Sequence, residues 1–239
     1  MPTCRSTNDI AAELATHQGA AAHGTVVWTH LQTAGRGQRG NSWESSAGQN
    51  LTFSLVLYHD QLLSQELFVI NQVVALALHD TITEILPQAE VWIKWPNDIW
   101  LNGGKVCGVL IENTLNQGRA LRSIVGIGLN VNQLTFSATK ATSLARVSGL
   151  SYSLEEVMKR FLSAFELRYA LLSPQGRHQL APAYQERLLG MGKPLRFRDA
   201  QGEIFIASVA GVKPDGHLLL LRHGQVVEFD IKELEWLLD

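Results

Sequence analysis

Residues 35–43 of this 239-residue chain read Gly35-Arg36-Gly37-Gln38-Arg39-Gly40-Asn41-Ser42-Trp43, and the rest of the sequence is organised around them. The glycines permit backbone conformations with positive φ and let successive N–H groups converge on an anion, while the arginines carry fixed positive charge. The pattern is typical of a loop that binds a phosphate-bearing ligand, although a mobile basic surface loop would look similar. Trp43 favours the first interpretation, because a large aromatic can fold over a bound ring and exclude water. The stretch is therefore predicted to be a lid.

Polar residues flank this loop at the ends of predicted elements. Upstream, Ser6-Thr7-Asn8 precede apolar residues at helical spacing, which predicts a helix from these residues to Gly19. Val26–Gln32 is predicted to be a strand that delivers the Gln32 amide to the edge of the loop. Each has a structural alternative, because Ser6-Thr7-Asn8 can simply cap a helix and Gln32 can be an ordinary strand-end amide. Downstream, Leu51–Tyr58 alternates like a strand with one buried face.

The middle of the chain places charged and amide groups next to apolar segments. Leu67–Leu86 is predicted to be the core helix and Val91–Trp95 a short strand. Lys94 lies within that apolar strand, so its ammonium group either reaches solvent or pairs with a negatively charged group. Asn97 and Asp98 follow at a break in the pattern, where they can face a ligand or a cation, or can stabilise the turn.

A tight hairpin is predicted at Asn102-Gly103-Gly104, because Asn-Gly is a strong turn signal between two apolar strand segments. Lys105 follows at the start of the second strand, where a lysine is usually just solvated. Gly108 within that strand indicates the close approach of another group. Leu121–Asn132 is predicted to be a further strand, thinned by two glycines, with the pattern of a pocket wall.

The last fifty residues differ from the rest in their sequence pattern. Before this change, Thr142-Ser143-Leu144 can cap a short helix, and Ser153-Leu154-Glu155-Glu156 is predicted to begin another. After Gly190, short predicted strands alternate with turns, at Leu195–Phe197, Ile204–Ala207, Leu218–Leu221 and Val226–Phe229. We therefore predict a large domain over residues 1–189 and a small β-barrel over residues 190–239.

Composition limits the possible classes of function. Hydrophobic residues make up 46% of the chain and charged residues 18%, with a net charge of −2, which argues against both disorder and a polyanion-binding surface. Cys4 and Cys107 cannot form a disulfide framework, and no spaced Cys/His cluster predicts a zinc site. There is no apolar signal core and no apolar run of about 18 residues. We expect a cytoplasmic protein without DNA or membrane partners.

Taken together, these motifs resemble those of the biotin protein ligases, the family of biotin–acetyl-CoA-carboxylase ligases. The motifs that carry the resemblance are Ser6-Thr7-Asn8, Gln32 followed by Gly35-Arg36-Gly37, Trp43, Lys94-Trp95-Pro96-Asn97-Asp98, Lys105, Gly126-Ile127-Gly128-Leu129-Asn130 and Thr142-Ser143-Leu144. The resemblance spans nearly the whole chain. It implies an α/β (α+β) fold with a mixed sheet flanked by helices, similar to class II aminoacyl-tRNA synthetases, and a C-terminal SH3-like β-barrel.

The resemblance also implies a two-step reaction. Biotin and MgATP would give biotinyl-5′-AMP and pyrophosphate, and the acyl group would then pass to a lysine of a biotin carboxyl carrier protein. ATP and Mg²⁺ are thus the expected cofactors, biotin the substrate and the carrier protein the partner. An exposed sheet edge in the large domain would also allow two subunits to pair as a homodimer.

Site residues follow from the resemblance, position by position. Residues expected to contact biotin or its activated carboxylate are Ser6, Thr7, Asn8, Gln32, Arg36, Gly37, Gln38, Lys105 and Gly108, with Lys105 and Arg36 as the catalytic cations. The adenylate side would involve Arg39, Trp43, Asn97 and Asn130, and Asp98 would lie near the metal. Two anions must react, so cations and fixed dipoles are needed rather than a strong base. No base for the transfer step can be assigned.

The chain departs from the family pattern in two places. Gln38 stands where the family often has an arginine, so a direct charge contact is not expected there. Only five residues precede Ser6, so the helix-turn-helix domain of bifunctional members, and repressor activity, are not expected. A lipoate ligase or octanoyl transferase is the alternative enzyme. A non-catalytic biotin-sensing or nucleic-acid-binding module is the alternative from another class, and the near-neutral charge argues against it.

Overall fold

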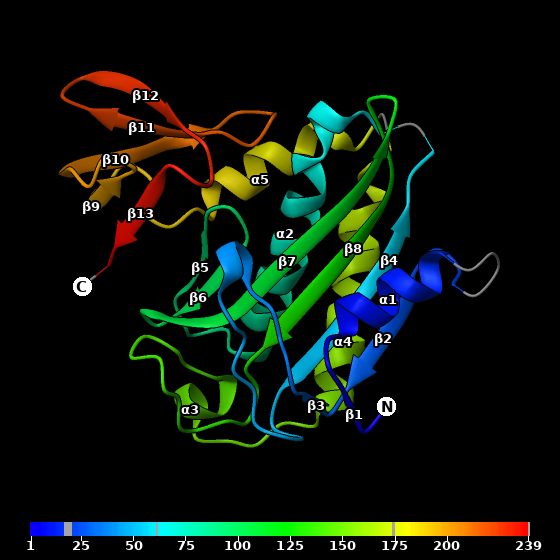
Figure 1. Ribbon diagram of the computed structural model, residues 1–239. Helices are drawn as coiled ribbons and strands as arrows, with labels where there is room; N and C mark the ends of the chain where they lie inside the picture. The colour runs from blue at the N-terminus through cyan, green and yellow to red at the C-terminus, as the bar shows by residue number, and fades with distance from the viewer. Residues whose placement is uncertain (17–20, 61, 174, 239) are drawn as a thin grey trace.

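The computed structural model describes residues 1–16, 21–60, 62–173 and 175–238. Two sheets dominate the fold, one of six strands in the order β2-β4-β8-β7-β6-β5 and one of five C-terminal strands (Figure 1). The strands of the larger sheet are β2 (Thr25–Thr29), β4 (Leu51–Tyr58), β5 (Val91–Lys94), β6 (Asp98–Leu101), β7 (Gly104–Asn116) and β8 (Arg119–Leu129). A separate two-stranded sheet pairs β1 (Thr3–Cys4) with β3 (Leu31–Gln32).

The large sheet is antiparallel throughout, and among the strands that the structure describes only β1 and β3 pair in parallel, apart from isolated parallel bridges such as that of Ile93 with Leu188. The predicted mixed sheet is corrected accordingly. The reason is that β5 to β8 follow one another through short turns, and a short turn joins neighbouring strands only in the antiparallel sense. The Asn102-Gly103 turn between β6 and β7 is confirmed, with φ of 47° and 81°, the left-handed pair that such a hairpin requires.

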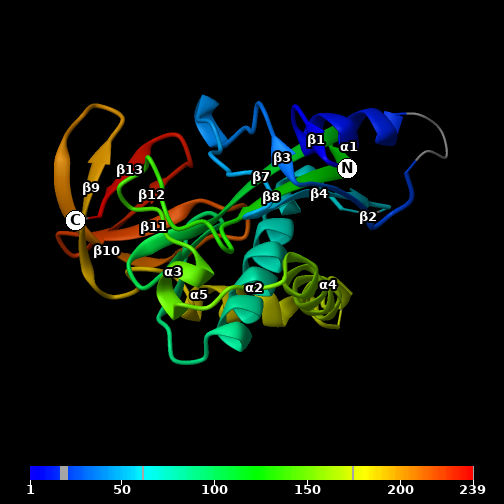
Figure 2. The same cartoon turned by 90° about the horizontal axis from the view of Figure 1, so that it is seen from below.

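Helices cover both faces of the large sheet (Figure 2). The helices of the fold are α1 (Thr7–Thr16), α2 (Phe68–Ile85), α3 (Leu144–Ser148), α4 (Leu154–Ala170) and α5 (Leu180–Glu186). On one face, α2 packs against α4 and α5, and the main core lies between them and the sheet. On the other face, α1 covers a smaller cluster, Ala11, Val27, Val56 and Ile124. Since α1 covers only part of its face, the rest of that face is left for the site.

Most predicted elements are confirmed. The predicted core helix is α2, and the predicted strand at Leu51–Tyr58 is β4 with the same bounds. The expectation of one buried face is wrong, because every residue of β4 except Tyr58 is buried, on both faces of the sheet. Ser143 and Ser153 begin α3 and α4, and each side chain accepts a hydrogen bond from the backbone N–H three residues later. The predicted strand at Val26–Gln32 is divided into β2 and β3. The predicted end of the first helix, Gly19, lies outside the described residues.

The C-terminal residues form the predicted small β-domain, but as an open five-stranded sheet rather than as a barrel. Its strands are β9 (Pro194–Asp199), β10 (Ile204–Val212), β11 (Leu218–Arg222), β12 (Gln225–Phe229) and β13 (Leu234–Leu237), in the order β12-β11-β10-β9-β13. The sheet stays open because β12 pairs with β11 while β13 pairs with β9, at the opposite edge. β13 was not predicted from the sequence.

The C-terminal sheet is docked against the segment that joins β5 to β6. The indole Nε1 of Trp95 donates a hydrogen bond to the carbonyl oxygen of Gly216, between β10 and β11, at 2.9 Å. The same segment is also held by α5, because the Tyr184 hydroxyl donates to Pro96 O at 2.7 Å. A Cβ on Gly216 would lie 2.6 Å from the Phe68 ring, so only glycine lets the backbone at position 216 pack so closely against Phe68. The two-domain division at residues 189 and 190 stays a prediction. Of the helices that the structure describes, none is long and apolar enough to cross a membrane.

Candidate functional site

One cavity of about 260 Å³ lies on the sheet face that α1 leaves uncovered. It is bounded by the glycine-rich loop, the start of α1, strands β6 to β8 and the C-terminal sheet. Most of the predicted site residues line it: Ser6, Thr7, Asn8, Gln32, Arg36, Gly37, Gln38, Trp43, Asp98, Lys105 and Gly108. Four stretches that are far apart in the sequence therefore meet at one place.

Glycines in β7 and β8 form the floor of the cavity. Gly108 and Gly128 are direct partners across the two strands, and both lie under the Trp43 indole. A Cβ on Gly128 would be 2.3 Å from Trp43 Cε2, and one on Gly126 would be 2.3 Å from Asn8 Oδ1. Real Cβ atoms do not approach other atoms so closely, so both positions require glycine as long as Trp43 and Asn8 stay in place. The strand that was predicted to form a pocket wall thus forms part of the cavity floor, and its glycines leave room for the side chains of Trp43 and Asn8.

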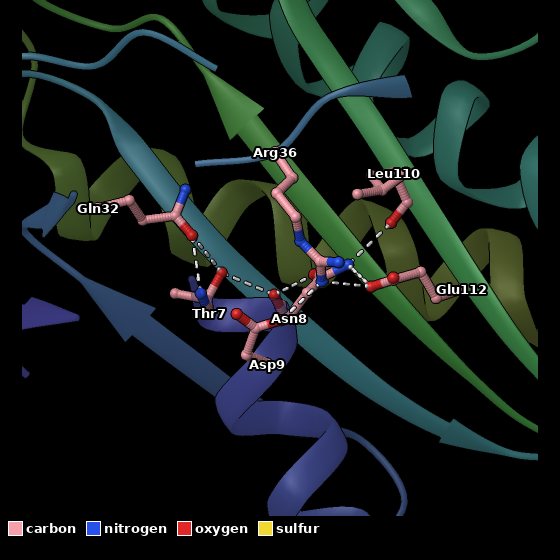
Figure 3. A network of polar contacts seen from close by, with 8 residues as sticks. Thr7, Asn8, Asp9, Gln32, Arg36, Leu110 and Glu112 are labelled. Carbon is pink, nitrogen blue, oxygen red and sulfur yellow. Dashed lines mark hydrogen bonds and ion pairs between the residues drawn. The ribbon is translucent and has the colours of Figure 1, made fainter. Parts of the chain in front are cut away.

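The start of α1 presents buried polar groups that are held by the neighbouring strands (Figure 3). The Thr7 backbone N–H donates to Gln32 Oε1 at 2.7 Å, and the Thr7 hydroxyl donates to the same oxygen at 3.1 Å. Ser54 Oγ lies 2.6 Å from Asn8 Oδ1 and 2.7 Å from Thr7 Oγ1, and its one proton serves one of them at a time. Residues 6–8 therefore do more than begin a helix, since their side chains line the cavity in fixed orientations.

Arg36 extends from the loop toward α1, where two carboxylates hold it (Figure 3). Its NH2 group is 2.7 Å from Asp9 Oδ1 and 3.1 Å from Glu112 Oε2. The Arg36 side chain is 46% exposed, so solvent screens these ion pairs. Neither carboxylate was predicted from the sequence, because neither belongs to a motif that the sequence analysis singled out. Both pairs use the NH2 group, so the other N–H donors of the guanidinium can still bind a ligand anion.

Lys105 and Asp98 form an ion pair at the opposite side of the cavity. Lys105 Nζ lies 2.7 Å from Asp98 Oδ2 and 5.9 Å from the centroid of the Trp43 ring. The hairpin places them together, since Asp98 begins β6 and Lys105 follows the turn into β7. The Lys105 side chain is 36% exposed and lines the cavity, so the plain surface-lysine alternative does not describe its position. Lys94 also lines the cavity, with Nζ 5.7 Å from the Trp236 ring centroid.

The loop itself forms a short hairpin with a helical turn at its tip. Arg36 and Ser42 form an isolated bridge, and the Trp43 N–H donates to Gly35 O at 3.0 Å. At the tip, Gln38 Nε2 donates to Asn97 Oδ1 at 3.0 Å and to Val109 O at 3.2 Å. Gln38 thus fastens the loop to β7 through neutral hydrogen bonds.

Three predicted site residues are not placed on the cavity surface. Asn97 is buried behind it and connects Gln38 to Asn71, to which its Nδ2 donates at 2.7 Å. Asn130 is buried with its Nδ2 donating to Thr142 O at 2.9 Å, and its Oδ1 is without a hydrogen-bond partner among the described residues. The side chain of Arg39 lies outside what the structure describes. Nucleotide contacts by these three residues stay predictions.

The C-terminal sheet contributes a wall that sequence reasoning missed. The contributing residues are Ile231, Leu234, Glu235 and Trp236. The sequence predicted no strand at residues 234–237. The one feature of this stretch that could have indicated a site is the aromatic Trp236 next to a charged residue.

Cys107 lies beside the site but is not a candidate nucleophile. It is fully buried in β7, and burial, together with the nearby Asp98 carboxylate, raises its pKa far above the ordinary thiol value. The nearby Lys105 ammonium acts in the opposite direction without overcoming these effects. The neutral thiol therefore dominates at physiological pH, and covalent chemistry through a thiolate is excluded at this position.

Comparisons with known proteins agree with this geometry. In fold, the chain is similar to the biotin protein ligase of Aquifex aeolicus in complex with biotin and ATP, with a TM-score of 0.79, 24% identity, and coverage of 100% of this chain and 97% of that one. In sequence, it is 34% identical over 220 residues to the bifunctional ligase/repressor of Bacillus subtilis, covering 90% of this chain. The chain spans 66% of the length of that relative.

Two shorter relatives are matched over most of their length. The biotin–acetyl-CoA-carboxylase ligase of Paracoccus denitrificans is 33% identical over 202 residues, covering 81% of this chain and 82% of that protein. The ligase of the same name from Mycobacterium tuberculosis is 30% identical over 226 residues, covering 93% and 82%. The model of the Biotin/lipoate A/B protein ligase family matches residues 1–130, which is more than half of the chain. The chain therefore belongs to the biotin/lipoate A/B protein ligase family.

Proposed function

We propose that this protein is an ATP-dependent biotin–protein ligase that makes biotinyl-5′-AMP and transfers biotin to a lysine of a biotin carboxyl carrier protein. One observation carries the proposal: residues 6–8, the loop at 35–43, the Asp98–Lys105 hairpin and the glycine floor all border a single cavity. The relatives named above as biotin–acetyl-CoA-carboxylase ligases support the same activity. Cytoplasmic localisation and the absence of a DNA partner stay predictions.

In the first step, a carboxylate oxygen of biotin attacks the α-phosphorus of ATP and pyrophosphate leaves. Both reactants are anions, so the barrier falls when fixed cations stand beside them. Lys105 and Arg36 are the cations on the cavity wall that we assign to this role. Trp43 would cover the reacting groups from the loop side and exclude water, which protects a hydrolysable mixed anhydride. A polar cluster at Thr7, Asn8 and Gln32 would hold the other end of biotin.

The donor set of the cavity is compatible with Mg²⁺. Asp98 is a cavity-lining carboxylate, and within the described ranges no three His, Cys, Asp or Glu side chains gather closely enough to hold a metal ion by themselves. Mg²⁺ in nucleotide sites is commonly held by one or two carboxylates together with substrate phosphates, and the cavity is lined by two carboxylates, Asp98 and Glu235, of which we assign Asp98 to this role. When bound, the ion would neutralise phosphate charge.

In the second step, the uncharged amine of the carrier lysine attacks the acyl carbon of biotinyl-5′-AMP, AMP leaves and the amine loses a proton. A lysine is protonated at neutral pH, so it must lose a proton before it attacks. The base for this step stays unassigned.

Pyrophosphate release tests the proposed function. The purified protein is incubated with ATP, Mg²⁺ and either biotin or lipoate, and pyrophosphate is measured. We expect release that depends on biotin and not on lipoate. Release with lipoate alone would assign the chain to the lipoate branch of its family, and no release with either substrate would favour a binding module.

Gln38 gives a prediction about how long the intermediate is retained. Its contacts to Asn97 and Val109 are neutral, whereas an arginine would offer a charge-assisted hydrogen bond roughly twice as strong. We expect biotinyl-AMP to leave the Gln38→Arg variant more slowly than the wild type, with little change in the rate of adenylation. Dissociation of the preformed intermediate is measured at two salt concentrations, since a charge contact is the more salt-sensitive. Identical escape rates would mean that position 38 does not contact the intermediate.

The exposed edge of the large sheet is our candidate for a homodimer contact. β2 is the first strand in the sheet order and pairs with β4 alone within the six-stranded sheet. A strand with a neighbour on one side only can pair with a second copy, although the Trp28 carbonyl of β2 already accepts a hydrogen bond from the Met1 amine at 2.8 Å. Sedimentation at increasing protein concentration tests this, and a Val26→Lys substitution at this edge is expected to weaken association. Association that is unaffected by this change would place the contact elsewhere.

A further inference from the structure

We infer that Glu112 is a positioning residue that couples the start of α1 to the glycine-rich loop. The inference rests on the proposed function. Glu112 does not line the cavity, but one of its oxygens contacts two residues that do, Asn8 from α1 and Arg36 from the loop. Three segments far apart in the sequence therefore meet at a single carboxylate oxygen (Figure 3).

The contact to Asn8 fixes the orientation of its amide. Asn8 Nδ2 donates to Glu112 Oε2 at 2.7 Å, and Asn8 Oδ1 accepts from Ser54 Oγ at 2.6 Å. An amide can be turned either way, but an ionised carboxylate only accepts hydrogen bonds, so it selects the orientation with the NH₂ group toward it. The carbonyl end of Asn8 is thereby directed to Ser54 and to the glycine floor. Asn8 Nδ2 also donates to Leu110 O at 3.5 Å, so loss of Glu112 leaves the amide held only by this long hydrogen bond and by Ser54.

The contact to Arg36 holds the loop in its folded-down position. Arg36 NH2 lies 3.1 Å from Glu112 Oε2, on β7, so this ion pair joins the loop to the sheet. Asp9 pairs with the same NH2 group at 2.7 Å but, in the part of the chain that the structure describes, makes no hydrogen bond to Asn8. Glu112 therefore has two functions where Asp9 has one. Asp9 is for that reason the matched control.

Three variants separate these two functions: Glu112→Ala, Glu112→Gln and Asp9→Ala. Glu112→Ala removes both contacts, and Glu112→Gln keeps an acceptor for Asn8 but removes the charge that holds Arg36. Asp9→Ala removes one Arg36 pair and leaves the Asn8 contact intact. The Glu112 and Asp9 side chains are 40% and 55% exposed, so these changes leave the core untouched, and thermal melting verifies folding.

Biotin affinity is measured first, by calorimetric titration. We expect Glu112→Ala to weaken biotin binding about tenfold, the lower range for a hydrogen bond to a charged group. Glu112→Gln and Asp9→Ala are expected to stay within about twofold of the wild type, because both keep an acceptor for Asn8. Wild-type affinity in Glu112→Ala would overturn the inference, as would equal losses in Glu112→Ala and Asp9→Ala.

Hydrogen exchange of residues 35–43 in the ligand-free protein is the second measurement. We expect faster exchange in both Glu112 variants than in the wild type, because both release Arg36 from β7. Unchanged exchange would overturn the coupling to the loop. This measurement needs no biotin, so it tests Glu112 even if the wild type fails to bind biotin, a result that would instead refute the proposed function.

Discussion

Replacing Lys105 by alanine is expected to lower the rate of biotinyl-AMP formation by roughly 10²-fold to 10³-fold, the effect of removing one preorganised donor from a developing negative charge. The Lys105 ammonium stands 2.7 Å from Asp98 and lines the cavity, and under the proposed function it would be the fixed cation on the β7 side of the reacting groups. Its loss removes stabilisation of the transition state and also leaves the Asp98 carboxylate uncompensated. Single-turnover formation of the intermediate, with biotin and ATP in excess, is the measurement.

Lys159→Ala is the matched control for this prediction. Lys159 is also an ammonium group paired with carboxylates, at 3.1 Å from Glu155 and 3.2 Å from Glu156, but it lies on the surface of α4, on the opposite face of the sheet. Its removal is expected to leave adenylation unchanged. If Lys105→Ala and Lys159→Ala behave alike, Lys105 is an ordinary surface lysine and the proposed role is wrong.

The local elements of the fold were predictable because their signals are local. Leu51–Tyr58 was predicted with its observed bounds, and the Asn102-Gly103 turn and the Ser143 and Ser153 caps formed as their chemistry requires. The small C-terminal β-domain was predicted from four short apolar segments, but it is an open sheet rather than a barrel, because closure depends on which strands pair and local apolar patterns do not specify this. The strand at Leu234–Leu237 was missed because it pairs with β9, about forty residues earlier in the chain, and local periodicity does not report such pairing.

The cavity residues that belong to sequence motifs were predictable, whereas those that reach the cavity only through the packing of distant segments were not. Ser6, Gln32, Trp43 and Lys105 were selected from motifs, and all four line the cavity. Glu112 was missed because a carboxylate within a strand is ordinary until Asn8 and Arg36 are seen beside it. Trp236 was missed for the same reason, since its relation to the cavity arises from the docking of the C-terminal sheet.

The glycine floor gives the second large expected effect, and it is specific to position. Gly126→Ala would place a Cβ 2.3 Å from Asn8 Oδ1, so the Asn8 side chain must leave its contacts with Ser54 and Glu112. Gly128→Ala would place a Cβ 2.3 Å from Trp43 Cε2, so the indole must rise from the sheet instead. Both are overpacking changes, which typically cost about 1 to 3 kcal/mol. The two substitutions are chemically identical and lie two residues apart on one face of β8, so each is the control for the other.

We expect Gly126→Ala to weaken biotin binding at least about tenfold, because a displaced Asn8 leaves its hydrogen bonds unmade. Gly128→Ala is expected to change biotin binding less and to speed the escape of biotinyl-AMP, because Trp43 is the side chain that covers the cavity from the loop side. Calorimetric titration with biotin and dissociation of the preformed intermediate separate the two effects, with melting temperatures as the check on folding. If both variants lose biotin affinity equally, the floor acts through general distortion of β8, and Asn8 and Trp43 have no separate tasks.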